Sequence, residues 1–312
     1  MTSRAAVCKP EASGKHTSPD AKLLHFIPLL SFWLKTSRPG LWLTTVWFYV
    51  LPLGQHRLFG SWVFWAGLLF FTFPFCFLIY GLNDIGDRET DRLNPRKDSY
   101  LFGARGSEEQ IAGLPRTIAL ILTPFAVLFV YLVGIKALGW FLAVLAANAL
   151  YNWPTHGLKS RPPFDMVNQA GYLLVFVLSS WLNAVPQLPL PTFLFGALFA
   201  MHSHLFGEIL DVEPDSMSGR RTTAVAIGIR ASKFILAAFL VLEGAIVAGI
   251  LGNLWIGAFL GFCALWFVLD AGVMLRNREY TPNQIRLFAF ALNAVALISM
   301  PLVWASGTFS HR

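Results

Sequence analysis

Residues 80–98 read YGLNDIGDRETDRLNPRKD, and they bring a row of three aspartates to the end of an apolar stretch. Asp84, Asp87 and Asp91 are spaced three and then four residues apart. On a helix this spacing places the carboxylates within an arc of about 60° and along about 10 Å of the helix. We call these three residues the first acidic row, and their spacing predicts that they face one site.

A second acidic row lies in the stretch EILDVEPD and consists of Glu208, Asp211 and Asp215. It repeats the spacing of the first row 124 residues further on, and it also begins where an apolar stretch ends. A single row of this kind is typical of a solvated helix end whose acids pair with neighbouring arginines. Two matching rows favour two walls of one metal site.

The composition indicates a membrane protein. Of the 312 residues, 55% are hydrophobic and 13% are charged, whereas a soluble domain carries about 25% charged residues. The chain has 28 Phe and 11 Trp, more aromatic surface than one aqueous core normally takes. Its three cysteines are far apart and lack the spacing of a disulfide framework or a zinc site.

Nine apolar stretches are long enough to cross a bilayer as helices, because about 20 apolar residues span the hydrocarbon core. They are residues 41–59, 61–82, 117–133, 137–151, 166–185, 190–210, 232–251, 254–275 and 285–304. The shorter stretch 23–34 predicts a helix lying in the membrane interface. Residues 1–22 are polar and predict a disordered tail. The sequence thus predicts an all-α, polytopic membrane protein with a single membrane-embedded domain at residues 23–312.

The basic residues indicate the orientation of this domain. With nine spans, 21 of the 24 Lys and Arg residues fall on the side of the N-terminus, and only Arg57, Lys136 and Arg312 fall on the other side. Positively charged loops stay in the cytosol, so we expect a cytosolic N-terminus and a C-terminus on the opposite side. Because topology accounts for the net charge of +7, we expect no nucleic-acid partner.

The two acidic rows predict magnesium. Two carboxylates about 4 Å apart repel by about 4 kcal/mol at an effective dielectric constant of about 20, so converging rows need cations. Oxygen-only ligands favour magnesium, manganese or calcium over zinc. Magnesium is usually held by one or two carboxylates, waters and substrate phosphate oxygens. We expect two Mg²⁺ ions with all six acids as ligands, and we expect Asp84, Asp87, Asp211 and Asp215 to be the catalytic residues.

Basic side chains accompany the acidic rows and predict that an anionic group binds between them. The candidates for substrate binding are Arg88, Arg96, Lys97, Lys159, Arg220 and Arg221. Membrane topology or contact with lipid headgroups explains the presence of any one of these residues. Together, however, they favour the binding of a diphosphate.

An isoprenyl diphosphate combines such a head with a chain that belongs in lipid, where each buried methylene contributes about 0.8 kcal/mol. Magnesium would turn the diphosphate into a leaving group. A lipophilic acceptor would then attack the allylic cation in a dry cavity. Aromatic residues that would face the cation, or serve as packing or interfacial residues, are Phe75, Tyr80, Tyr151, Trp153 and Phe206. Tyr151 is also a candidate either for orienting the substrate or for tying helices together.

The first acidic row with Asn83 matches the motif NDxxDxxxD, and the second row matches DxxDxxxD with Glu208 in place of the first Asp. With these motifs the chain resembles the UbiA-type intramembrane prenyltransferase family. Further points of likeness are Arg38-Pro39, Trp42, the segment 151–159 and Thr222-Thr223. The resemblance implies a nine-helix bundle with a central cavity, magnesium dependence and a role for Asn83 in binding metal and substrate.

Within that family, residues 80–98 are most similar to the lycopene elongase group, which attaches prenyl units to a carotenoid. This resemblance implies carotenoid biosynthesis with an acceptor such as lycopene. Two alternatives stay open: a UbiA-type terpene cyclase acting on the prenyl diphosphate alone, and a prenyltransferase with an aromatic quinone-precursor acceptor. A transporter is disfavoured, because its carboxylates would lie near the midplane of the membrane.

Four of the ionisable residues inside predicted spans each have two possible roles. His202 and His204 are each a candidate base for the final proton or a hydrogen-bonded residue of the bundle. Glu243 and Asp270 are costly in a membrane, so each predicts either a functional group or a protonated acid in an interhelix hydrogen bond.

Overall fold

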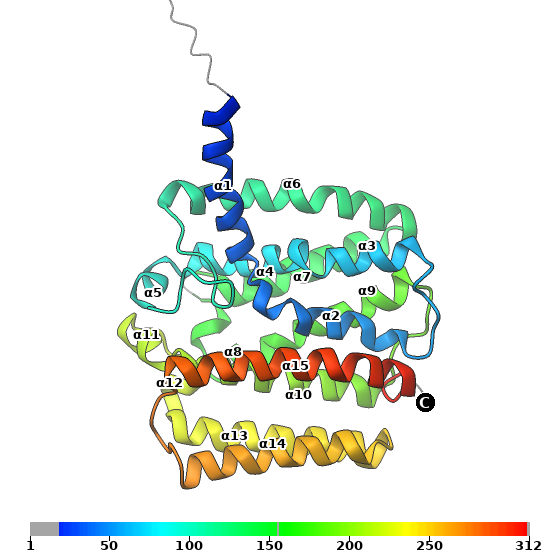
Figure 1. Ribbon diagram of the computed structural model, residues 1–312, viewed down its shortest axis with the longest axis vertical. Coiled ribbons are helices and arrows are strands. Elements are labelled where there is room, and N and C mark those ends of the chain that lie inside the picture. Colours follow the sequence, from blue (N-terminus) through cyan, green and yellow to red (C-terminus); the bar gives the residue numbers. More distant parts are fainter. Residues whose placement is uncertain (1–18, 155, 311–312) are drawn as a thin grey trace, which may run out of the picture.

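The helices of this protein lie side by side in layers, and most of their axes run in one common direction (Figure 1). The computed structural model describes residues 19–154 and 156–310. Over these residues every regular element is a helix, and one isolated β-bridge joins Ser99 and Gly103. The predicted all-α fold is confirmed.

Six helical segments among the described residues are long and apolar enough to cross a membrane. They are α3 and α4 (Trp62–Phe70 and Phe73–Gly86), α6 (Glu108–Val133), α10 (Leu190–Leu210), α13 with its π-helical extension (Ile229–Ala245 and Ile246–Ile250), α14 (Leu254–Gly272) and α15 (Pro282–Ser306). The prediction of a polytopic membrane protein is confirmed by these segments.

The other three predicted spans are shorter or interrupted helices. They correspond to α2 (Trp42–Val50) with a 3₁₀ turn (Leu51–Leu53), to α7 (Lys136–Asn152), and to α8 (Phe164–Val167), a 3₁₀ segment (Asn168–Leu173) and α9 (Leu174–Leu182). The first predicted span ran to residue 59, but helical structure stops at Leu53. Pro52 lacks the backbone N–H that an α-helix would need at this point.

Helix α1 (Pro19–Thr36) lies across the direction of the bundle helices (Figure 1). An interfacial helix would have this direction. It begins four residues before the predicted helix at 23–34, so residues 19–22, predicted to belong to a disordered tail, are its first turn. The rest of that predicted tail, residues 1–18, lies outside the described residues.

The long helices that enter the bundle from the loop end have defined starts. At α6 the Ser107 hydroxyl accepts a hydrogen bond from the Gln110 amide at 3.2 Å, and the Gln110 side chain accepts one from the Ser107 amide at 2.9 Å. Thr281 and Gln284 repeat this pairing at the start of α15. Such capping boxes satisfy amides that the helix itself leaves free, and they fix where the preceding loops end.

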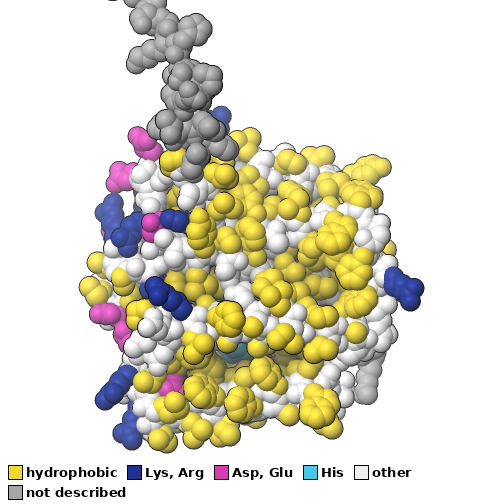
Figure 2. All heavy atoms as spheres, in the orientation of Figure 1, with side chains coloured by type: hydrophobic (Ala, Val, Ile, Leu, Met, Phe, Trp, Pro, Cys, Tyr) yellow, Lys and Arg dark blue, Asp and Glu magenta, His cyan; other side chains and the backbone are white. Residues whose placement is uncertain are grey.

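Charged side chains gather at one end of the bundle. Figure 2 shows most of the visible Lys, Arg, Asp and Glu side chains along the left edge, with hydrophobic side chains covering the lateral surface. Two short helices, α5 (Arg88–Leu93) and α11 (Val212–Met217), lie at this same end (Figure 1). The two acidic rows therefore lie where the bundle meets a polar environment.

Candidate functional site

The two acidic rows share one backbone geometry. Asp84 lies in the last turn of α4, Asp87 follows that helix, and Asp91 lies in α5. The second row repeats the pattern across α10 and α11. The residue at each break has nearly the same conformation, with φ −105° and ψ 15° at Asp87 and φ −106° and ψ 9° at Asp211. Each row is thus bent at its middle residue, which corrects the expectation of three carboxylates on one straight helix.

Asp84 is buried, with 1% of its surface exposed, and lies between two basic side chains. Its Oδ1 accepts hydrogen bonds from Lys97 Nζ at 2.8 Å and from Arg38 at 3.2 Å. The same Lys97 Nζ lies 2.7 Å from Asp91 Oδ2. Lys97 therefore joins the first and last carboxylates of the first row.

Asp87, the middle residue of the first row, accepts hydrogen bonds from three side chains. The Asn83 amide donates to its Oδ2 at 2.8 Å. Lys159, from the loop after α7, and Arg220, from the loop after α11, both donate to its Oδ1. The resulting pocket of donors around Asp87 has the charge and geometry that a diphosphate oxygen also requires.

The second acidic row is held in the same way, by residues of the loop after α5 (the first loop) and by Arg220. Arg96 forms an ion pair with Asp211, and the Asn94 amide donates to the same oxygen at 2.8 Å. Asp215 Oδ1 lies 3.4 Å from Arg220. Both carboxylates therefore depend on donors that lie outside their own helices.

The two rows face one another, because their ion pairs cross between them. Arg220 joins Asp87 of the first row to Asp215 of the second. Arg96, from the first loop, pairs with Asp211 of the second row. Two loops more than a hundred residues apart in sequence therefore close over one site.

Glu208 is held differently from the aspartates. Its Oε2 accepts a hydrogen bond from the Ala224 amide at 3.1 Å, at the first turn of α12 (Thr223–Ile227), and its Oε1 lies 3.1 Å from His204 Nε2. The carboxylate of the buried Asp165 accepts a hydrogen bond from the neighbouring Thr223 backbone amide at 2.5 Å. The longer Glu side chain thus reaches the start of α12, which follows directly after the loop that carries Arg220.

Burial and neighbouring charges shift the pKa values of the row carboxylates. Burial raises the pKa of Asp91 to about 7, against the effect of Lys97. Burial also raises the pKa of Asp215 to about 7, against Arg220 and together with Asp211. For Asp87 burial acts in the same direction, but Arg220 and Lys159 hold its pKa below the ordinary value. Proton affinity therefore differs sharply between neighbouring carboxylates, a pattern typical of functional sites.

Four of the six predicted basic residues contact the acidic rows: Arg96, Lys97, Lys159 and Arg220. The other two, Arg88 and Arg221, are exposed and form no ion pair with a described residue. The structure therefore does not bring these two into the cluster of donors.

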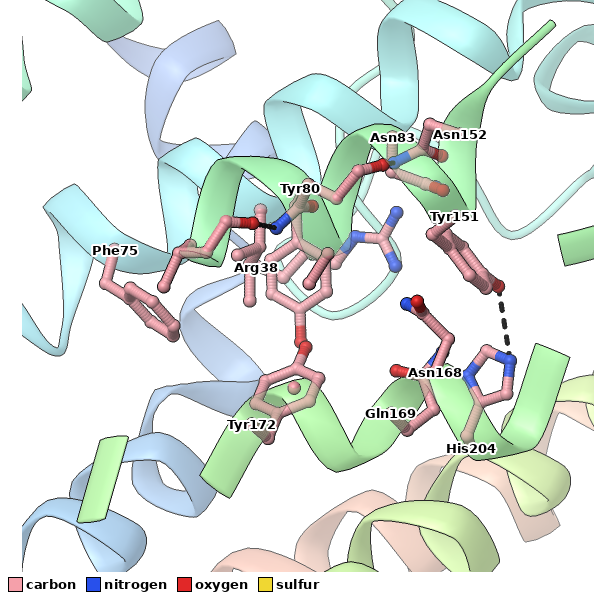
Figure 3. A pocket seen from close by; sticks show the side chains of 15 residues that line it. Arg38, Phe75, Tyr80, Asn83, Tyr151, Asn152, Asn168, Gln169, Tyr172 and His204 are labelled. Carbon is pink, nitrogen blue, oxygen red and sulfur yellow. Dashed lines mark hydrogen bonds between the residues drawn. The ribbon is translucent and has the colours of Figure 1, made fainter. Parts of the chain in front are cut away.

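A cavity of about 160 Å³ lies beside the first acidic row and is lined by α4, α7, the segment 168–172 and α10. The Arg38 guanidinium extends toward its middle and lies 4.3 Å from the centre of the Tyr80 ring (Figure 3). The Tyr151 hydroxyl is 3.2 Å from His204 Nε2. Polar groups and rings thus share one space, as a ligand with both a charged and an apolar part requires.

Three of the five aromatic residues predicted to face the cation line the cavity. They are Phe75, Tyr80 and Tyr151. Trp153 is instead 58% exposed, and the Phe206 ring packs against Phe267 and Phe288 on another side of α10. Interfacial and packing roles therefore explain the last two.

Sequence reasoning missed several residues of the site. They are Arg38 and Asn94, which contact the acidic rows, and Asn168, Gln169 and Tyr172, which line the cavity. Arg38 was noted only as a point of likeness to the family and Asn94 lies inside the stretch 80–98, but neither was predicted to contact the acidic rows.

The residues fit a hard divalent cation. Among the described residues no three carboxylate, His or Cys side chains converge as they stand, because Lys and Arg lie between the carboxylates. The donor set is nevertheless made of carboxylate and amide oxygens, which magnesium takes. In addition, Asp84 Oδ2 is buried and receives no hydrogen bond within the described part of the chain. This oxygen remains available as an acceptor for a cation.

Known proteins share this architecture and sequence. Residues 41–294 match the UbiA prenyltransferase family. The chain is 28% identical over 264 residues to a lycopene elongase/hydratase of Corynebacterium glutamicum, covering 79% of this chain and 89% of that protein. It is 31% identical over 222 residues to a lycopene elongase/hydratase of Haloarcula japonica, covering 67% and 73% of the two chains.

The fold is also similar to that of a solved structure, a UbiA homolog from Archaeoglobus fulgidus bound to DMAPP and Mg²⁺. The TM-score is 0.62 at 19% identity, and the match covers 88% of this chain and 99% of that one. At this identity the likeness concerns the fold.

Proposed function

Since this chain belongs to the UbiA prenyltransferase family and is an integral membrane prenyltransferase, we propose that it catalyses a magnesium-dependent transfer from an isoprenyl diphosphate to a lipophilic acceptor. The observation that carries this proposal is the crossed pairing of Arg220 with Asp87 and of Arg96 with Asp211. It brings oxygen ligands for a cation and donors for an anion to one place at the charged end of the bundle.

The metal ligands in this proposal are Asn83 and the six acids of the two rows, which would hold two Mg²⁺ ions. Bound magnesium supplies the charge neutralisation that lets a diphosphate leave. The two rows lie on opposite sides of the same space, so the ligands of both ions can come from both rows.

The basic side chains bind the diphosphate. Four basic side chains already donate hydrogen bonds to carboxylates: Arg96, Lys97, Lys159 and Arg220. When a carboxylate binds a cation instead, a diphosphate oxygen would accept the hydrogen bond that the carboxylate gave up. The allylic C–O bond then breaks, with its electron pair going to the diphosphate. Arg88 and Arg221 are exposed at the same end and would meet the outer part of the diphosphate.

The apolar half of the substrate lies in the cavity below the donors. Phe75, Tyr80 and Tyr151 line this space and present ring faces that attract a cation. Tyr151 would also orient the isoprenyl diphosphate, since a hydrogen bond to His204 holds its hydroxyl in place. Water must be kept from this space during the reaction, because it would otherwise quench the allylic cation.

The acceptor in this proposal is a carotenoid such as lycopene. The names of the two relatives support this, since both are called lycopene elongase/hydratase. A long polyene is soluble in the bilayer, so an enzyme embedded there meets it directly.

We further propose that residues 23–312 form one membrane-embedded domain with nine spans. The three shorter helical segments then cross the membrane with the six long ones. The excess of Lys and Arg at the end that carries both acidic rows supports a cytosolic N-terminus and a C-terminus on the opposite side.

Purified protein in liposomes, supplied with Mg²⁺, dimethylallyl diphosphate and lycopene, tests the proposal. We expect prenylated lycopene by mass spectrometry and its loss after chelation of the metal with EDTA. Hydrocarbon formed without an acceptor would instead identify a terpene cyclase. Prenylation of an aromatic quinone precursor but not of lycopene would identify that acceptor class, and the absence of every product would reject the proposal.

A further inference from the structure

The cavity beside the first acidic row has a polar end that contacts the charged site. Asn83, in the last turn of α4, donates to Asp87 at 2.8 Å, and the side-chain oxygen of Asn152, at the end of α7, lies 3.4 Å from Lys159 Nζ. Both asparagines also line the cavity. A substrate whose diphosphate occupies the cluster of donors therefore places its first carbons at this end of the cavity.

The apolar end lies deeper along the same two helices. On α4 the lining residues change from Asn83 to Ile79 and Phe75, and on α7 they change from Asn148 to Val144. Figure 3 shows Phe75 at the opposite end of the lining side chains from Asn83. Ile79 and Phe75 are one helical turn apart, about 6 Å. One isoprene unit adds four C–C bonds to a chain, which extend over about 5 Å. The apolar part thus has the length of one isoprene unit.

The volume of the cavity agrees with this length. The cavity measures about 160 Å³. In another protein, an apolar cavity of about 150 Å³ holds benzene, a ring of six carbon atoms. By this comparison the cavity accommodates a dimethylallyl group, which has five carbon atoms, but is too small for a geranyl group, which has ten. Both length and volume therefore indicate space for one isoprene unit.

Phe75 closes the apolar end and is held in place by other rings. Its exposed fraction is 2%. Its ring centre lies 5.3 Å from that of Phe71 and 5.9 Å from that of Trp140. Trp140 is itself fixed, because its Nε1 donates to the Leu174 carbonyl oxygen at 2.6 Å. Since such an interior is close-packed, the Phe75 ring has no space to move aside for a longer chain.

We propose that Phe75, supported by Trp140, ends the chain-binding part of the cavity and restricts the prenyl donor to a single isoprene unit. This inference rests on the proposed function and deepens it, since it assigns the choice of donor to a named residue. The second isoprene unit of a longer donor would collide with the Phe75 ring. Its diphosphate would then be displaced by about 5 Å, the length of one unit, from Lys159 and Arg220.

A competition between two donors tests the proposal. Liposomes receive Mg²⁺, lycopene and equal concentrations of dimethylallyl and geranyl diphosphate, and mass spectrometry measures the ratio of five-carbon to ten-carbon transfer. In the wild-type protein we expect a ratio of at least about 100, because a single methylene in an apolar pocket already changes discrimination by about 10–200-fold. Phe75→Leu should lower this ratio at least about tenfold, since the smaller side chain opens the end of the cavity.

Val144→Ala enlarges the same end with a smaller loss of packing than the loss of a ring. It should lower the ratio about threefold. The matched control is Phe129→Leu, which makes the same replacement as Phe75→Leu at another buried ring. Phe129 packs on Phe70 and Phe141 and does not line the cavity, so this variant should keep the wild-type ratio.

The melting temperature in detergent establishes which variants are folded. A wild-type ratio in folded Phe75→Leu, or an equal shift in Phe129→Leu, would overturn the proposal, as would a wild-type protein that transfers both groups equally. If Phe75→Leu does not fold, Val144→Ala decides, and an unchanged ratio there overturns the proposal. If the proposed function itself is wrong, the wild-type protein forms no prenylated lycopene from either donor.

Discussion

At the scale of single residues, the acceptor oxygens of Asp84 distinguish it from other acids of the same loop. One oxygen is shared by Lys97 and Arg38, and the other is buried without a hydrogen bond among the described residues. Asp98, fourteen residues later, is 58% exposed at its side chain, which pairs with Lys35 at 2.8 Å. These two aspartates therefore form a matched pair for mutagenesis.

Asp84→Asn should lower turnover at least about 100-fold, because a neutral amide replaces a charged ligand at the leaving group. Asp98→Asn should remain near wild type, since surface pairs contribute about 0–1 kcal/mol. Turnover is measured with saturating Mg²⁺, and melting temperature in detergent checks the fold. Comparable activity of the two variants would contradict the metal-binding role of the first acidic row.

At the scale of elements, a buried ion pair joins α13 and α14 to the loop before α15. Lys233 Nζ lies 2.8 Å from Asp270 Oδ2, and both side chains are almost fully buried. The Tyr280 hydroxyl donates to the same oxygen, and the Leu275 amide donates to the other at 3.2 Å. Asp270 therefore has the structural role that was one of its two sequence-based interpretations.

Asp270→Asn should destabilise the protein by about 3 kcal/mol, because it leaves the buried Lys233 without its counter-charge. The double variant Lys233→Met with Asp270→Leu should recover most of this loss, since it removes both charges. Thermal unfolding in detergent measures both. An unchanged melting temperature in Asp270→Asn would show that the pair does not stabilise this corner.

Close packing of α13 on α14 depends on the glycine at position 257. A Cβ added at Gly257 would lie 2.6 Å from the Ala248 Cβ and 3.0 Å from the Gly244 carbonyl oxygen, whereas at Gly261, one turn later, it would meet nothing within 4 Å. Gly257→Ala should lower the melting temperature through about 1–3 kcal/mol of overpacking. Gly261→Ala should be neutral or stabilising by up to about 1 kcal/mol. Equal melting temperatures would refute the close approach.

At the scale of the whole molecule, the charged end and the opposite end should face different compartments. In a cysteine-free background, Glu109→Cys lies at the charged end, and Gln187→Cys lies in the loop between α9 and α10. Both positions are exposed. A membrane-impermeant maleimide added to intact cells should label position 187 and spare position 109, because the positive end stays inside. The reverse pattern would invert the proposed topology.

The sequence by itself determined the membrane class, the helical fold and the residues of both acidic rows. Apolar stretches of span length and the spacing of Asp84, Asp87 and Asp91 are local properties that a linear chain displays. The sequence did not show that each row bends at its middle residue, Asp87 or Asp211, because the spacing was interpreted on a straight helix.

Tertiary structure alone decided which basic residues contact the acidic rows. Lys159 and Arg220 contact Asp87 from 72 and 133 residues away, while Arg88, its neighbour in sequence, points into solvent. His202 and Glu243 are likewise joined only because α13 packs on α10. Charge and hydropathy can be determined from the sequence position by position. A contact between residues distant in sequence depends on how the helices pack in the folded protein.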